Sequence, residues 1–197
     1  MRQDITIAGI FRPGQRTLGF VYDCFIVVCG SLLVGLSAHI KFYLPFSPVP
    51  VTAQTFVVLV LGILLGSKKG ALAIILYIAE GIAELPVFAA GFGVSALAGS
   101  TGGYLVGFIP AAYIVGRLAE MGWDRRIITT AAAMIIGDAI LLTFGFAWLV
   151  VLTGIKTAFI AGFLAFIPGD IVKVAIAAIG LPAAWKLLRF LNRNQKR

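Results

Sequence analysis

The chain has 197 residues, of which 60% are hydrophobic and 12% are charged, and its formal net charge is +8. Its mean hydropathy of +1.04 is higher than any soluble globular domain needs, so we predict an integral membrane protein. The basic residues flank apolar runs and form no aromatic-interleaved face, which favours a role in membrane topology over nucleic-acid binding. The spacing of Cys24 and Cys29 indicates neither a mutual disulfide on a straight helix nor a metal site.

The first apolar run, residues 18–40, is about as long as a membrane-spanning helix. Its small residues Ser31, Gly35 and Ala38 form a low-profile patch that lets another helix approach closely. Internal packing against a neighbouring span and docking of a partner protein are equally good interpretations of this patch. The preceding residues, 1–16, are predicted to be a polar tail.

Residues 41–52 carry three prolines that forbid a regular helix, although the segment is apolar and aromatic. Non-helical backbone at membrane depth must be shielded by protein or line a cavity. We therefore predict a lid folded over the mouth of a helix bundle. A second lid is predicted at residues 86–101, a long uncharged loop with glycines and several apolar side chains.

Further spans are predicted at residues 51–66, 70–85, 102–119, 127–152 and 157–188, with a turn at the lysine pair 68–69. Glu80 lies about one turn deeper in its span than Glu84 and is the better functional candidate. Asp138 lies near the middle of the fifth span with no partner nearby in the sequence. Together these runs predict an all-α, six-helix, single membrane domain with a core at 17–189 and polar tails at 1–16 and 190–197.

The sixth span contains the most unusual stretch of the chain, Pro168-Gly169-Asp170-Ile171-Val172-Lys173, which is expected to divide the span into two segments. In a helix, Asp170 and Lys173 lie on one face about one turn apart. One charge at the bilayer centre costs roughly 2.5–3.5 kcal/mol, so the pair is either an ion pair that locks helix packing or a ligand site. Because ionisable residues inside a membrane are functional by default, we favour the ligand site.

An even number of spans places both termini on one side of the membrane. Most of the 16 lysines and arginines lie on that side, so the positive-inside rule predicts cytoplasmic termini in a multi-pass protein of a prokaryotic-type plasma membrane. Both lids and the Asp170/Lys173 turn then share the outer half. This arrangement is typical of a pocket that is loaded from outside.

Motifs for catalysis are missing from the sequence. No stretch matches the phosphate-cradling G-x-x-x-x-G-K-[ST], and no H-E-x-x-H, G-x-S-x-G or Cys/His cluster occurs. The single histidine weakens any acid–base or metal-hydrolysis interpretation. We therefore predict a binding protein that is not an enzyme. It is expected to hold no cofactor or metal and to have no ATP-hydrolysing domain of its own.

Four ordered motifs resemble the BioY family, the biotin-specific substrate-binding (S) components of energy-coupling factor (ECF) transporters. They are Ser47-Pro-Val-Pro-Val-Thr-Ala-Gln-Thr-Phe56, Leu85-Pro-Val-Phe88, Ser100-Thr-Gly-Gly-Tyr-Leu105 and Phe166-Ile-Pro-Gly-Asp-Ile-Val-Lys173. The resemblance implies a six-helix bundle whose outer half captures biotin, coupled to a transmembrane scaffold protein and a pair of cytoplasmic ATPases. Glu84 stands where the family commonly has glycine, Ser100 stands where proline is common, and Glu80 is also unusual.

By this resemblance, Asp170 and Lys173 correspond to the acid and the base of the family's motif. It implies that Asp170 accepts ureido N–H groups, while Lys173 serves the carboxylate or the ureido oxygen of biotin. Gln54 can donate and accept hydrogen bonds near the first lid. The other implied site residues are Tyr43, Phe92 and Tyr104 as aromatic walls, Glu80 as a further ligand candidate, and Ser31, Gly35 and Ala38 as the dock for the scaffold protein.

Other functions stay open at this point. One is a solitary or proton-coupled carrier that uses Asp138, Glu80 and Glu84 as titrating groups. Another is a protein of the same fold that captures a different vitamin. An intramembrane enzyme is disfavoured because the sequence offers no nucleophile–base pair.

Overall fold

Each of the six predicted spans corresponds to a helical segment in the described chain. The computed structural model describes residues 6–194, with side chains up to residue 191. The helices are α1 (Ile7–Ile10), α2 (Arg16–Ser37), α3 (Gln54–Leu65), α4 (Ser67–Ile82), α5 (Gly93–Ala98), α6 (Gly102–Glu120), α7 (Ile127–Thr153), α8 (Ile155–Thr157) and α9 (Ile167–Asn194). A short 3-10 turn (Trp123–Arg125), a π-helical segment (Ala158–Leu164) and the strands β1 (Lys41–Phe42) and β2 (Val51–Thr52) complete the described elements.

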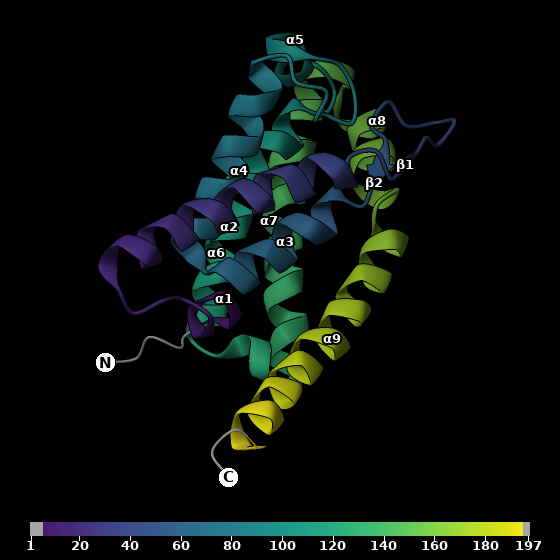
Figure 1. The fold of residues 1–197 in the computed structure, drawn as a ribbon. Coiled ribbons are helices and arrows are strands. Elements are labelled where there is room, and N and C mark those ends of the chain that lie inside the picture. Colours follow the sequence, from purple (N-terminus) through teal and green to yellow (C-terminus); the bar gives the residue numbers. More distant parts are fainter. Residues whose placement is uncertain (1–5, 195–197) are drawn as a thin grey trace.

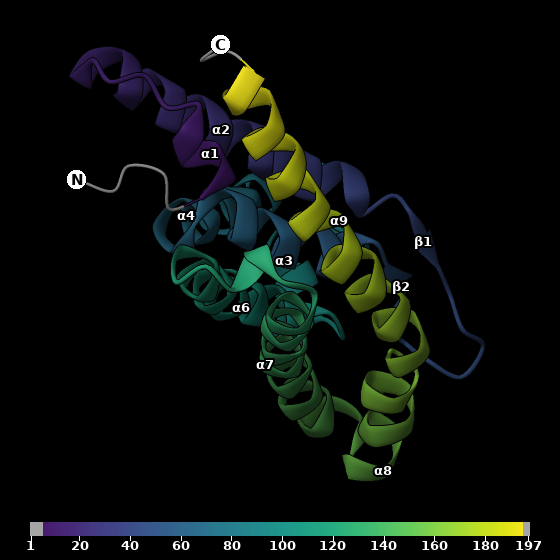
Figure 2. The same cartoon turned by 90° about the horizontal axis from the view of Figure 1, so that it is seen from below.

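Both ends of the chain lie at the same end of the bundle. Figure 1 shows the two termini and α1 at one end, and β1, β2, α5 and α8 at the opposite end. α9 runs along one side of the molecule and connects these two ends, as the turned view in Figure 2 also shows. We call the first end the terminal end and the second the lid end.

The helices differ in how they meet the membrane. Within residues 6–194, α2, α6, α7 and the helical run 155–191 are long and apolar enough to cross a bilayer. α3 has only 12 residues, most of them buried, and it packs against α2, α4, α6, α7 and α9. A helix that is apolar all round belongs in the interior of a bundle, which accounts for the central place of α3.

Glycines let α3, α4 and α6 pack unusually closely. A Cβ atom at Gly62 would lie 2.5 Å from the Ala112 carbonyl oxygen, and one at Gly116 would lie 2.5 Å from the Ser67 nitrogen. Between α3 and α4 the chain turns at Gly66, whose φ of 86° lies in the left-handed region that favours glycine. The turn therefore precedes the predicted one, and the lysine pair belongs to the first turn of α4.

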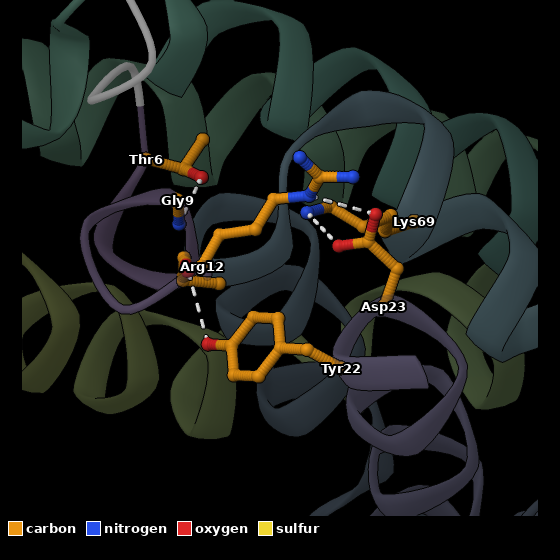
Figure 3. A network of polar contacts seen from close by, with 7 residues as sticks. Thr6, Gly9, Arg12, Tyr22, Asp23 and Lys69 are labelled. Atoms are coloured by element: carbon orange, nitrogen blue, oxygen red, sulfur yellow. Dashed lines mark hydrogen bonds and ion pairs between the residues drawn. The ribbon is translucent and has the colours of Figure 1, made fainter. Parts of the chain in front are cut away.

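The N-terminal segment is more ordered than a polar tail. α1 packs against α3, and the hydroxyl of Tyr22 donates to the Ala8 carbonyl at 3.0 Å. Asp23 on α2 accepts from Arg12 Nε at 2.9 Å and from Lys69 Nζ at 3.0 Å (Figure 3). The folded core thus begins before residue 17, whereas residues 1–5 of the predicted tail lie outside the described part. At the other end α9 continues to Asn194, which leaves 195–197 of that tail outside the description.

Both predicted lids lie at the lid end, and both contain regular structure. The first holds an antiparallel pair, with Lys41 opposite Thr52 and Phe42 opposite Val51. The second contains α5 and is therefore not a structureless loop. In the sixth span, the π-helical segment and a short turn precede α9, so Pro168 lies in the first turn of α9, where its missing N–H costs no hydrogen bond.

Candidate ligand site

The buried Asp170 pairs with the half-buried Lys173, which also bonds to a third residue. Asp170 lies in the first turn of α9, with only 5% of its surface exposed. Lys173 Nζ donates to Asp170 Oδ1 at 2.8 Å and to Thr55 Oγ1 on α3 at 2.7 Å. Asp170 Oδ2 is buried and accepts no hydrogen bond from any described side chain or backbone group. A buried acceptor without a donor is costly, so this oxygen is available for a ligand.

Asp138 on α7 belongs to the same charge cluster. Its carboxyl lies close enough to Asp170 and Lys173 to interact electrostatically with both. The sequence offered no partner for Asp138, and the structure supplies one through the packing of α7 against α9. The cluster holds two carboxyl groups for one ammonium group.

A cavity of ≈ 30 Å³ adjoins this cluster beneath the lids. Thr55 belongs to both, because its side chain bonds Lys173 and it also lines the cavity. Gln54, Tyr104, Leu105, Phe108 and Phe166 line the helical side of the cavity, and the lids contribute Val49, Pro50, Thr52, Ala89 and Thr101.

Gln54 and Tyr104, which both line this cavity, are fixed in place by hydrogen bonds. Gln54 is buried, and its Nε2 donates to the Tyr77 hydroxyl on α4 at 2.6 Å. The Tyr104 hydroxyl donates to the Gly162 carbonyl, and its ring lies 5.5 Å from that of Phe166. α7 leaves room for this ring at Gly145, where a Cβ atom would lie 2.1 Å from Tyr104 Cε1.

Hydrogen bonds from side chains to backbone carbonyls hold the lids closed. The four donor–acceptor pairs are Lys41 Nζ to Ala89 O, Ser100 Oγ to Pro48 O at 3.0 Å, Ser47 Oγ to Ala161 O at 2.8 Å, and Trp148 Nε1 to Gly99 O at 2.9 Å. The first two join one lid to the other, and the last two join a lid to the π-helical segment or to α7. A vitamin-sized pocket has about 300–1,000 Å³, so ligand entry requires these lids to move.

The two predicted lid aromatics point away from the closed cavity. Tyr43 is 59% exposed and Phe92 is 61% exposed, and neither lines the cavity. Both lie on segments that must move for a ligand to enter. Their role as walls of an occupied site therefore stays a prediction.

The predicted partner dock lies inside the protein. Ser31 and Ala38 are fully buried, and a Cβ atom at Gly35 would lie 3.1 Å from the Val87 side chain of the second lid. Ser31 Oγ also donates to Glu80 Oε1 at 2.8 Å. The small-residue face is covered by α4 and the second lid, so a scaffold dock at these residues stays a prediction that would require the cover to move. Internal packing, the alternative left open above, describes this arrangement.

Glu80 and Glu84 lie apart from the cavity. Glu80 joins α4 to α2 through Ser31, and neither glutamate lines the cavity. Glu84 follows the end of α4 with a φ of 65°, which makes it the only non-glycine residue with positive φ in the described chain. This left-handed conformation gives a physical reason for glycine to be common at this position.

Sequence reasoning missed Thr55 and left Asp138 unassigned. Thr55 directly follows Gln54 at the start of α3, so its place beside the first lid was a usable signal. Asp138 lies in the middle of a predicted span, a depth similar to that expected for Asp170. Depth alone, however, does not reveal which two helices are neighbours.

Comparison with known proteins identifies close relatives in sequence. The model of the BioY family matches residues 11–190 of this chain. A protein named "Biotin transporter BioY" from Rhizobium etli is 35% identical over 158 residues, which cover 76% of this chain and 84% of that protein. A "Probable biotin transporter BioY" from Pyrococcus horikoshii is 38% identical over 153 residues, which cover 76% of this chain and 89% of the relative.

A solved structure shares the fold. The crystal structure of the S-component for biotin from an ECF-type ABC transporter matches with a TM-score of 0.75 and 21% sequence identity, covering 88% of this chain and 95% of that one. The predicted all-helical bundle of the ECF S-component type is therefore confirmed.

Proposed function

The chain belongs to the BioY family, and from this premise we propose that it captures biotin and moves it across the membrane as the substrate-binding subunit of an ECF-type ABC transporter. The observation that carries the proposal is the position of the Asp170–Lys173 pair next to the cavity under the lids. Transport and not catalysis is the activity of this family.

The chemistry of the cluster suits the chemistry of biotin. Biotin is a monoanion with a ureido ring, a thioether and an apolar tail, so its host needs one cation, partners for the ureido group and aromatic walls. Asp170 Oδ2 offers a free acceptor for ureido N–H groups. Lys173 supplies the cation for the carboxylate or the ureido oxygen, and charge-assisted hydrogen bonds in a dry site are strong.

The remaining walls come from the helices and the lids. Gln54 and Thr55 offer further polar groups to the ligand, and the rings of Tyr104 and Phe166 line its apolar side. Tyr43 and Phe92 would add aromatic contacts when the lids close over a bound ligand. Glu80 is left out of this ligand set because its carboxylate is bonded to Ser31 between two helices.

Transport requires partners in this scheme. The sequence has no phosphate-cradling motif, so hydrolysis of ATP falls to a separate pair of cytoplasmic ATPases, joined to this chain by a transmembrane scaffold protein. The terminal end faces the cytoplasm, and the lids open to the outside. Uptake of biotin by cells that express the chain with and without such a module tests this requirement.

The binding site is tested with labelled biotin and the purified protein. Asp170→Asn and Lys173→Ala should each weaken affinity by roughly 10- to 100-fold, because each removes a charge-assisted contact in a dry site. Lys156→Ala is the matched control, because that lysine is exposed near the same end of the membrane. Unchanged affinity in both site variants, with normal elution on size exclusion, rejects the proposal.

An uncharged ligand distinguishes the two roles of Lys173. Biotin amide keeps the ureido ring but lacks the carboxylate. If Lys173 contacts the carboxylate, Lys173→Ala should weaken biotin but leave the affinity for biotin amide nearly unchanged. If Lys173 contacts the ureido oxygen, the variant should weaken both ligands to a similar extent.

A second candidate function is autonomous, proton-coupled uptake. The observation in its favour is the placement of Asp138 beside Asp170 and Lys173, where two carboxyl groups share one ammonium group. Proteoliposomes that contain only this chain should then accumulate biotin in response to a pH gradient, and Asp138→Asn should abolish that response. Absence of uptake without ATPases leaves the subunit function as the better description.

A further inference from the structure

A second hollow lies at the terminal end of the protein, far along the bundle from the lids. This groove has a volume of ≈ 510 Å³ and lies between the start of α4 and the end of α6. Its basic lining residues are Lys68, Lys69 and Arg117. Asp23 and Glu120 are its acidic residues, so cations outnumber carboxylates in the lining.

Both carboxylates of the groove already have partners. Asp23 lies between Arg12 and Lys69, each of which approaches one of its oxygens (Figure 3). Glu120 Oε1 accepts from the backbone nitrogen and the hydroxyl of Ser67, both at 2.8 Å, and its Oε2 accepts from Arg117 Nη1 at 3.1 Å. Asp23 and Glu120 therefore connect the helices around the groove. Their charge is balanced by partners other than Lys68.

Within the part of the chain that the structure describes, no acidic side chain pairs with the remaining positive charge of the groove. Lys68 is exposed and takes part in none of the ion pairs or hydrogen bonds between described side chains. The Arg117 side chain is 63% exposed and uses Nη1 alone for Glu120, so further N–H donors of its guanidinium group face outward. Among the described residues, the groove thus offers one ammonium group without a partner and one guanidinium group with a single partner to an anion.

The surface next to this groove is apolar. On α4, Lys68 shares a helical face with Leu72 and Ile75, both of which are exposed. On α6, Arg117 shares a face with the exposed Tyr113. α4 and α6 pack against each other, and each carries one of these exposed faces next to the groove. An anion with apolar chains would match both the charge of the groove and the apolar surface beside it.

We propose that this groove binds the phosphate group of an anionic phospholipid, with Lys68 and Arg117 as phosphate contacts and the exposed faces of α4 and α6 as the seat of the acyl chains. The lipid belongs to the leaflet on the side of the termini. Basic residues near a membrane surface attract anionic lipids in this way. The proposal is independent of biotin binding, because the groove shares no lining residue with the cavity under the lids.

Lipid titrations of the purified full-length protein test this site. Native mass spectrometry and thermal stability are followed as phosphatidylglycerol or phosphatidylcholine is added to detergent micelles. Phosphatidylglycerol should bind with a saturating stoichiometry and raise the melting temperature, and phosphatidylcholine should do so at concentrations about tenfold higher. Equal effects of the two lipids overturn the proposal.

A matched pair of variants locates the effect. Lys68→Gln/Arg117→Gln should weaken phosphatidylglycerol binding about tenfold. Lys186→Gln/Arg189→Gln makes the same change in charge on the exposed side of α9 and should leave that binding unchanged. Equal losses in the two double variants show a diffuse surface charge effect and overturn the assigned site.

Two further measurements test whether binding at the groove requires acyl chains and whether it is separate from biotin binding. Inorganic phosphate and glycerol phosphate, which lack acyl chains, should give no stabilisation at millimolar concentrations, and a shift equal to that of the lipid overturns the lipid assignment. Biotin affinity should be unchanged in Lys68→Gln/Arg117→Gln. If that variant loses biotin as well as lipid, the groove is not a separate site and the proposal fails.

Discussion

At the lid end the buried Asp170 pairs with the half-buried Lys173, which also bonds to Thr55. At the terminal end Arg12, Asp23 and Lys69 form ion pairs whose side chains are 24–39% exposed. Water and lipid headgroups reach the exposed pairs, so each contributes little to the free energy of folding. In the buried cluster, electrostatic interactions are stronger and an unpaired oxygen stays costly. The same residue types therefore lie in a largely buried cluster at one end and in partly exposed ion pairs at the other.

Of the variants that follow, those that remove the hydrogen bonds between the two lids should have the largest effect. Lys41→Met/Ser100→Ala removes both bonds between the two lids. Each bond contributes about 1 kcal/mol, so the double variant should release biotin about tenfold faster or more. Dissociation of labelled biotin after a chase with unlabelled ligand measures the rate.

A serine elsewhere in the lid provides the control for this experiment. Ser95 donates to the Phe92 carbonyl within its own lid, at 2.6 Å, and bonds to no other element. Ser95→Ala should therefore leave the dissociation rate nearly unchanged. Equal dissociation rates in the double variant and the wild type would show that the lid bonds do not limit release.

The described part of the terminal end also contains a buried acid, Asp124. Unlike the exposed ion pairs there, it should contribute measurably to the free energy of folding. Asp124 is almost fully buried, and Trp185 Nε1 on α9 donates to its Oδ2. Burial raises the pKa of Asp124 above its ordinary value, against the opposing effects of the Trp185 hydrogen bond, its own backbone N–H and Arg125. Deprotonation therefore destabilises the folded state, and stability falls as the pH rises from about 3.8 through the raised pKa.

Asp124→Asn should remove this pH dependence, since the amide oxygen still accepts from Trp185 but carries no charge. We expect the variant to melt a few degrees above the wild type at pH 7 and at the same temperature near pH 4. Asp124→Leu, which leaves the indole N–H of Trp185 without an acceptor, should melt below the wild type at both pH values. Parallel pH profiles of the wild type and Asp124→Asn would contradict a titrating Asp124.

The smallest effect is expected at Glu84, where the lid end begins. Glu84→Gly should stabilise the protein by about 1 kcal/mol, because a residue with a side chain is strained at a φ of 65°. Ala83→Gly is the matched control, since Ala83 has a φ of −74° and gains nothing from glycine. Melting temperatures should rise for the first variant and fall for the second, and a fall in both would show that no strain is stored at Glu84.

Much of the fold follows from local patterns in the sequence. Apolar runs locate the six helices, and prolines and glycines locate the two lids. The helical spacing of Asp170 and Lys173 places the pair on one face, because three residues make nearly one turn. The first turn of α9 also begins where Pro168 allows it to.

The parts that sequence reasoning missed depend on contacts between distant segments. A small-residue face at Ser31 and Gly35 looks the same whether α4 or another protein covers it. Asp138 gains its partners only from the packing of α7 against α9. Likewise, the burial of α1 against α3 leaves no periodic signal in a segment of four residues.

The four lid bonds share one chemical asymmetry, because every donor is a side chain and every acceptor is a main-chain carbonyl. A substitution at an acceptor position therefore still leaves a main-chain carbonyl oxygen to accept the bond. The acceptor positions are Pro48, Ala89, Gly99 and Ala161. Among the contacts that close the lids, substitutions at the four donor positions therefore change the retention of a ligand without rebuilding either lid.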